Sequence, residues 1–172
     1  QSDFIQADVE GSYDFATLIP SVKTMLSETF PQLFGAYNHV YRSRRPNDVD
    51  FHVVVNPSEE LQVFVNLPVK VLYKTTLDGH LNETDHSFDV QLNAPYLLQG
   101  NKNIIEQTNL SAQLDRITHR MIVNAHTMLP SKKGRINVDL DAHGRNDSLA
   151  TNLSWHVDRE REFSGNLNLT SV

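Results

Sequence analysis

The chain contains eight histidines and no cysteine, so catalytic or metal chemistry would have to rest on imidazole, carboxylate and hydroxyl groups. His80 and His86 flank one expected turn and could approach each other, but no acidic residues accompany them at the spacing of a metal ligand set. Solvated turn histidines are therefore the favoured interpretation. His119 is two residues from Ile117 and from Met121, so in a strand it would lie on the same face as these apolar residues, which predicts an inward-facing imidazole. A hydrogen-bonded core histidine is a simpler interpretation of it than a general base.

Signatures of the common enzyme classes do not occur in the sequence. It has no Gly-x-Ser-x-Gly nucleophile elbow, phosphate loop or dinucleotide fingerprint, and its seven glycines leave few for cradling phosphate. A net charge of -6 argues against nucleic acid as the main partner, because phosphate binding needs a concentrated basic surface. We therefore predict a protein that is not an enzyme, has no metal or catalytic cofactor, and does not bind nucleic acid.

Asn-x-Ser/Thr sequons indicate the compartment. They occur at five positions: Asn82, Asn109, Asn146, Asn152 and Asn168. The first and third fall in expected turns, and the others lie on the strand face opposite the apolar residues. A glycan has to point to solvent, so the sequons and the alternation independently select the same outer face. We expect a secreted glycoprotein without stable membrane insertion, since no apolar run could span a bilayer. The other interpretation, that Asn, Ser and Thr merely fill polar strand positions, stays open.

Alternation of apolar and polar residues is the main structural signal, because a period of two places side chains on opposite faces of a strand. It is clearest in three series separated by short turns, at 136–142, 149–157 and 163–169. Similar series earlier in the chain give about ten or eleven strands, whose spacing indicates antiparallel hairpins between sequence neighbours. The chain therefore predicts a long antiparallel meander with one apolar face.

One helical pattern interrupts the strands. Apolar residues recur at three- and four-residue intervals and predict an amphipathic helix over about 17–30, through Leu18, Ile19, Val22, Met25 and Leu26. Asp14 or Thr17 could cap this helix. Pro20 is expected to be tolerable only in the first turn, and Pro31 to end the helix.

These elements predict a single mainly β domain over residues 1–172. Its meander is expected to close into a barrel or a strongly curved sheet, with the helix packed in it or on it, because open edges and a bare apolar face invite aggregation. Two uses of the apolar face stay open. The halves of a sandwich could pack together and enclose nothing, or a barrel of eight or more strands could form a calyx around a ligand.

Three segments resemble the repetitive amphipathic strands of the large lipid transfer proteins, the superfamily of vitellogenins, insect apolipophorins and apolipoprotein B. They are 134–142 (GRINVDLDA), 149–155 (LATNLSW) and 165–170 (GNLNLT). Segments 90–95 and 110–114 show the same alternation of apolar and polar residues, so the resemblance covers roughly residues 60 to 172. It implies secretion, glycosylation, and carriage of lipid or of lipophilic pigments such as carotenoids against the strand face. It implies no catalytic residues.

Two features depart from that family. Its members are many times longer, and the helix at 17–30 is unlike a pure strand array. The chain begins at Gln1 without an initiator Met. We therefore expect either a processed fragment or a small independent carrier that closes its sheet around a ligand.

The function predicted from these patterns is that of an extracellular carrier of a hydrophobic small molecule, a lipid or an isoprenoid pigment. The alternative is a structural or interaction domain, a β-rich fragment of a larger secreted lipoprotein with a closed core and no ligand. A homo-oligomer or a larger lipoprotein assembly is compatible with both. The residues expected to contact ligand share the inward parity of their strands: Tyr73, Phe88, Val90, Met121, Val123, Leu153, Trp155, Leu167 and Leu169.

Overall fold

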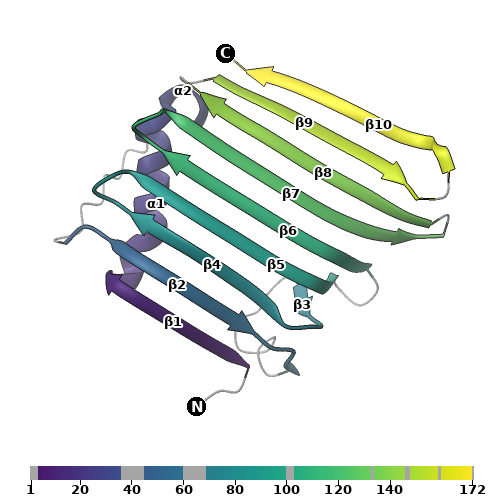
Figure 1. Ribbon diagram of the computed structural model, residues 1–172, viewed down its shortest axis with the longest axis horizontal. Coiled ribbons are helices and arrows are strands. Elements are labelled where there is room, and N and C mark those ends of the chain that lie inside the picture. Colours follow the sequence, from purple (N-terminus) through teal and green to yellow (C-terminus); the bar gives the residue numbers. More distant parts are fainter. Residues whose placement is uncertain are drawn as a thin grey trace.

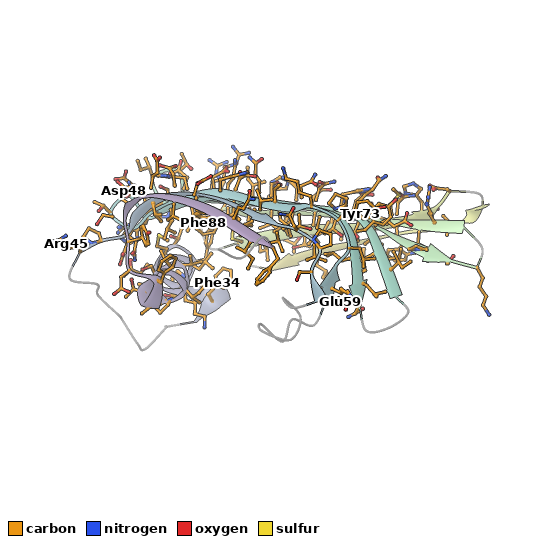
Figure 2. The ribbon with its side chains drawn as sticks, turned by 90° about the horizontal axis from the view of Figure 1, so that it is seen from below. Phe34, Arg45, Asp48, Glu59, Tyr73 and Phe88 are labelled. Atoms are coloured by element: carbon orange, nitrogen blue, oxygen red, sulfur yellow. The ribbon has the colours of Figure 1, made fainter. Side chains whose placement is uncertain are left out.

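The computed structural model describes residues 4–35, 45–59, 69–99, 103–132, 134–145, 148–158 and 160–171. They form two layers, a ten-stranded antiparallel sheet and a helix that lies against one face of it near one end of the strands (Figures 1 and 2). Alternation in the sequence also predicts strands at 37–42 and 61–67, and both stretches lie outside the described residues.

The elements follow the chain in a nearly uninterrupted meander. The first half contains β1 (Ile5–Ser12), α1 (Phe15–Thr29), α2 (Pro31–Phe34), β2 (Asp48–Val55), β3 (Val69–Val71) and β4 (Thr75–Asn82). The second half contains β5 (Ser87–Gln99), β6 (Asn103–Asp115), β7 (Arg120–Ser131), β8 (Gly134–Arg145), β9 (Ser148–Val157) and β10 (Glu160–Ser171). Across the sheet the order is β1-β2-β4-β5-β6-β7-β8-β9-β10, and β3 pairs with the far part of β5. The prediction of a mainly β antiparallel sheet with one amphipathic helix is confirmed.

The prediction of a closed barrel is wrong. Among the described strands, β1 pairs only with β2 and β10 only with β9, so these two strands form opposite edges of an open sheet (Figure 1). The sheet curves over α1 at one end of its strands (Figure 2), and this curvature does not bring β1 and β10 together.

Cross-strand partners lie on the same face of a sheet, and the registers align the apolar residues in rows that cross nine strands. The row under the helix, the helix row, contains Gly11, Val49, Leu81, Phe88, Leu114, Met121, Gly144, Leu149 and Ser171. The next row, the middle row, contains Val9, Phe51, Gly79, Val90, Ala112, Val123, Ala142, Thr151 and Leu169. A third row, the leucine row, contains Ala7, Val53, Leu77, Leu92, Leu110, Ala125, Leu140, Leu153 and Leu167.

The core is the contact between α1 and the helix row. Met25 and Phe30 are buried there against four residues of that row: Val49, Leu81, Leu114 and Met121. Gly144 makes room for the aromatic ring, since a Cβ at this position would be 3.1 Å from Phe30 Cζ. One short helix therefore anchors itself on strands from β2 to β8.

The start of α1 follows its sequence signals in part. Asp14 caps the helix, because its Oδ1 accepts a hydrogen bond from the backbone N–H of Ala16 at 3.0 Å. Pro20 lies beyond the first turn, so the prediction that it is tolerable only there is wrong. The N–H that proline lacks would have bonded the carbonyl of Ala16, and this residue is exposed, so water can bond that carbonyl instead.

A buried asparagine fixes the helix to the sheet. The side chain of Asn47 donates from Nδ2 to Thr17 Oγ1 at 2.9 Å, to Ser21 Oγ at 3.0 Å and to Glu83 Oε2 at 3.0 Å. Its Oδ1 accepts from the backbone N–H of Asp14 at 2.8 Å. Its backbone exchanges two further hydrogen bonds with Glu83. These bonds join α1 to the segment before β2 and to the turn after β4.

Phe30→Ala should destabilise the fold by about 3–5 kcal/mol, the usual cost of truncating a buried phenylalanine. Phe30 is 0% exposed in the core. Phe30 is the C-cap residue of α1, and the matched control is Phe15→Ala at the other end of the helix, because Phe15 is 69% exposed and should change stability by less than about 1 kcal/mol. Urea unfolding followed by circular dichroism measures both values. Equal losses in the two variants would contradict the assigned core.

Asn47→Ala should lower the free energy of unfolding by at least about 2 kcal/mol, because it leaves the buried hydroxyls of Thr17 and Ser21 without their donor. Asn93→Ala is the control, since this exposed side chain loses only its 2.8 Å hydrogen bond to Asn109. The same urea titration compares them. A loss at Asn47 no larger than that at Asn93 would show that the asparagine does not hold the helix.

Candidate hydrophobic ligand site

The leucine row has no cover from the helix. The core cluster and the residues packed against it include members of the helix row and the middle row but none of the leucine row. All nine residues of that row are half-buried or exposed, and Leu167 at its end is 45% exposed. Trp155 and Leu169, on the same face, are 39% and 57% exposed. We call the leucine row together with these two residues the open apolar face.

Four of the nine predicted ligand contacts lie together on this open apolar face. Leu153 and Leu167 are direct cross-strand partners in β9 and β10, and Trp155 and Leu169 flank them. The indole of Trp155 lies over Gly165, its own partner in β10, where a Cβ would clash with the ring. The glycine therefore lets the tryptophan lie flat across the outermost strand.

Four other predicted contacts lie under or next to the helix. Met121 is buried in the core, and Phe88 and Val123 pack against it. Val90 is half-buried in the middle row. Met121 is 6% exposed and is closed to a ligand while α1 is in place, whereas Phe88 and Val123 are half-buried beside the core. These residues do lie on the apolar face, as their alternation predicts, but alternation does not reveal which row of that face the helix covers.

Tyr73 is not on the inward face of a strand. Alternation through Val69, Val71 and Leu77 predicts a single strand, but the strand is interrupted between β3 and β4. Both pieces pair with β5, in registers that differ by one residue, and Tyr73 lies in the interruption. Its exposed ring lies 5.0 Å from that of Tyr96, centroid to centroid (Figure 2 labels Tyr73).

Sequence reasoning missed the central residues of the site. The middle of the leucine row consists of four leucines that were not among the expected contacts, Leu77, Leu92, Leu110 and Leu140. They carry the same alternation as the residues that were chosen. Only the cross-strand register shows that they form one continuous row.

The opposite face of the sheet is polar, and nitrogen and oxygen atoms crowd it (Figure 2). An open trough of about 590 Å³ runs over it. Its side chains bond one another across strands: Asn93 Nδ2 donates to Asn109 Oδ1 at 2.8 Å, and His126 Nδ1 lies 2.6 Å from Asp139 Oδ1. Such a surface is suited to water and not to an apolar ligand.

The sequons follow this division in part. Asn109 and Asn168 are exposed on the polar face, and Asn152 is half-buried on it. Asn82 ends β4, where its Oδ1 accepts from the N–H of Asp85 at 2.8 Å. Asn146 lies outside the described residues.

The histidines do not assemble into a site. His80 is in β4 rather than in a turn, and its Nδ1 lies 2.9 Å from Asp50 Oδ1, whereas His86 Nδ1 lies 3.0 Å from Glu28 Oε2 of α1. The prediction that His119 faces inward is wrong, because its N–H bonds the carbonyl of Arg116 in an exposed turn. Across the described part of the chain, no three His, Asp or Glu residues are placed to hold a metal ion.

Comparison with known proteins returned no relative. The chain matches no protein-family model, no curated protein and no solved structure. The resemblance to large lipid transfer proteins therefore stays a prediction that rests on the strand pattern. Among the described residues, no helix is both long and apolar enough to cross a membrane.

Proposed function

We propose that this protein is an extracellular carrier that holds lipids, or lipophilic pigments such as carotenoids, against its open apolar face. The leucine row supports this proposal. It contains nine apolar residues in succession, one from each strand except β3, without a polar interruption. At the usual strand spacing of about 4.8 Å, such a row extends for roughly 38 Å.

Removal of this surface from water would drive binding. Apolar area gains about 25 cal/mol for each Å² that is buried, and a continuous apolar surface on a folded protein usually marks an interaction site. Because the sheet is open, the ligand would lie along the rows of the face and would not enter a closed calyx. The occupant is then an array of hydrocarbon chains, packed on the face as the side chains of α1 pack on the helix row.

In this proposal the polar face is the side of the carrier that is directed to water. Asn109 and Asn168 would carry glycans into water from the face opposite the lipid. Secretion is part of the proposal for this reason. No role in the proposed function requires catalysis, a metal or a nucleic acid.

The second candidate is a structural domain of a larger lipoprotein. The closed core of Met25, Phe30 and the helix row favours it, since this part of the fold is complete without a ligand. In that case another polypeptide segment, and not lipid, covers the leucine row.

Protein secreted from animal cells and purified without detergent should contain lipid or pigment in a fixed ratio to the chain, measured by absorbance and by mass spectrometry of a solvent extract. Leu153→Asp should lower the bound amount by at least about tenfold, because each 1.4 kcal/mol lost from the contact changes the binding constant tenfold. Its control is Asn166→Asp, which adds the same charge on the exposed polar face beside Leu167 and leaves all five sequons intact.

Circular dichroism checks that both variants are folded. A soluble, folded protein that yields an empty extract would refute the carrier and favour the structural domain. Equal lipid contents in the two variants would also refute it, because the open apolar face would then have no role.

Glycan occupancy provides an independent check of the outer face. In the same secreted protein, peptide mapping by mass spectrometry should find glycans at Asn109 and Asn168, and enzymatic removal of glycans should leave the lipid content unchanged. Secreted protein with no glycan at either position, or loss of lipid on deglycosylation, would contradict the assignment of the polar face to water.

A further inference from the structure

The two edges of the sheet differ in how they are protected against pairing. The β1 edge carries two exposed acidic residues, Asp8 and Glu10, and a glycine at φ 121°, Gly11, which departs from regular strand geometry. The β10 edge has no charged residue and no proline between Ser164 and Ser171. Charges, prolines and irregularities are what usually keep an edge strand from pairing. On β10 they are confined to its start, where Glu160, Arg161 and Glu162 stand and the register shifts before Gly165, so the stretch from Gly165 to Ser171 is unprotected.

The β10 edge has the backbone groups that a further strand needs. Because β10 pairs with β9 on one side only, every second residue turns its N–H and C=O away from the sheet. Leu167 and Leu169 are the last apolar residues of two rows and are half exposed, since no described strand continues those rows.

We propose that a second copy of this chain occupies the β10 edge, through antiparallel pairing of β10 with the partner's β10 around Leu167. In this register Leu167 is opposite the partner's Leu167, and Asn166 is opposite the partner's Asn168. Leucines therefore meet on the apolar face, where each covers the other. Polar positions meet on the other face, where a glycan on Asn168 still points to solvent.

The tryptophan fits the same register. Gly165 is opposite the partner's Leu169, and the indole of Trp155 already lies over Gly165. The leucine of each copy would therefore contact the tryptophan of the other, and both exposed side chains would gain cover.

The pairing also closes the assembly. Its two-fold axis is perpendicular to the sheet, so it uses the unprotected edge of both copies and leaves the two acidic β1 edges outside. A dimer is expected and not a fibre. The apolar faces of the two copies lie on the same side, and their leucine rows join end to end.

Single cysteines test this register cleanly, because the chain has none of its own. Directly opposed residues have Cα atoms about 4.5–5.5 Å apart, within the range of a disulfide. Leu167→Cys should therefore form a covalent dimer on oxidation. Thr170→Cys should not, since the two copies of this position would be about 20 Å apart at 3.4 Å per residue. Ala7→Cys, at the β1 end of the leucine row, should not either.

The unmodified chain should have twice its 19.5 kDa mass in light scattering after size exclusion. If Leu167→Cys does not fold, a mixture of Asn166→Cys and Asn168→Cys tests the same register from the polar face. A monomer at all soluble concentrations would overturn the proposal, as would oxidative dimers that form equally well at Thr170 or Ala7. These readouts do not require bound lipid, so the dimer and the carrier can fail separately.

Discussion

The structure depends on a mismatch between the apolar area of a long sheet and the one helix available to cover it. The fifteen residues of α1 give a helix about 22 Å long at 1.5 Å per residue, whereas a row across nine strands extends for about 38 Å. A helix is about 10 Å wide, and successive rows on one face are about 7 Å apart along the strands. One helix can therefore cover the central part of one row and the margin of the next. The core contains the middle of the helix row, and Val9 and Val123 of the middle row pack against it, whereas no residue of the leucine row does.

The way in which α1 is attached to the sheet agrees with the division of the apolar face into a part under the helix and an open leucine row. Three of its four buried residues, Thr17, Ser21 and Thr29, carry hydroxyl groups, and Asn47 bonds two of them. Hydrogen bonds with defined geometry therefore fix the helix at one place along the strands, and a purely apolar contact would allow it to slide. A fixed helix leaves a defined surface beside it. The polar face has its own cross-strand bonds and needs no cover.

Much of the fold could be predicted from the sequence, because strand alternation and helix capping are local signals. The hairpin order and the cap at Asp14 follow from them. Barrel closure could not be decided in this way, since it depends on whether the first and last strands, β1 and β10, pair with each other, which no local pattern records. The candidate site was predicted in part for the same reason. Met121 and Leu153 have the same parity, but the first is under the helix and the second is on the open face. Tyr73 was misplaced because the pairing with β5 shifts by one residue between β3 and β4. Asn47 gave no signal because a single asparagine outside a pattern predicts no contact.

Trp155, the single tryptophan of the chain, is on the open apolar face and reports directly on what covers it. The decisive measurement is its fluorescence in the presence of phospholipid with brominated acyl chains, compared with the same lipid without bromine. If the open apolar face holds hydrocarbon chains, the brominated lipid quenches Trp155 and both lipids protect it from acrylamide in the water. Emission that is unchanged by bromine and equally open to acrylamide with and without lipid would contradict the account.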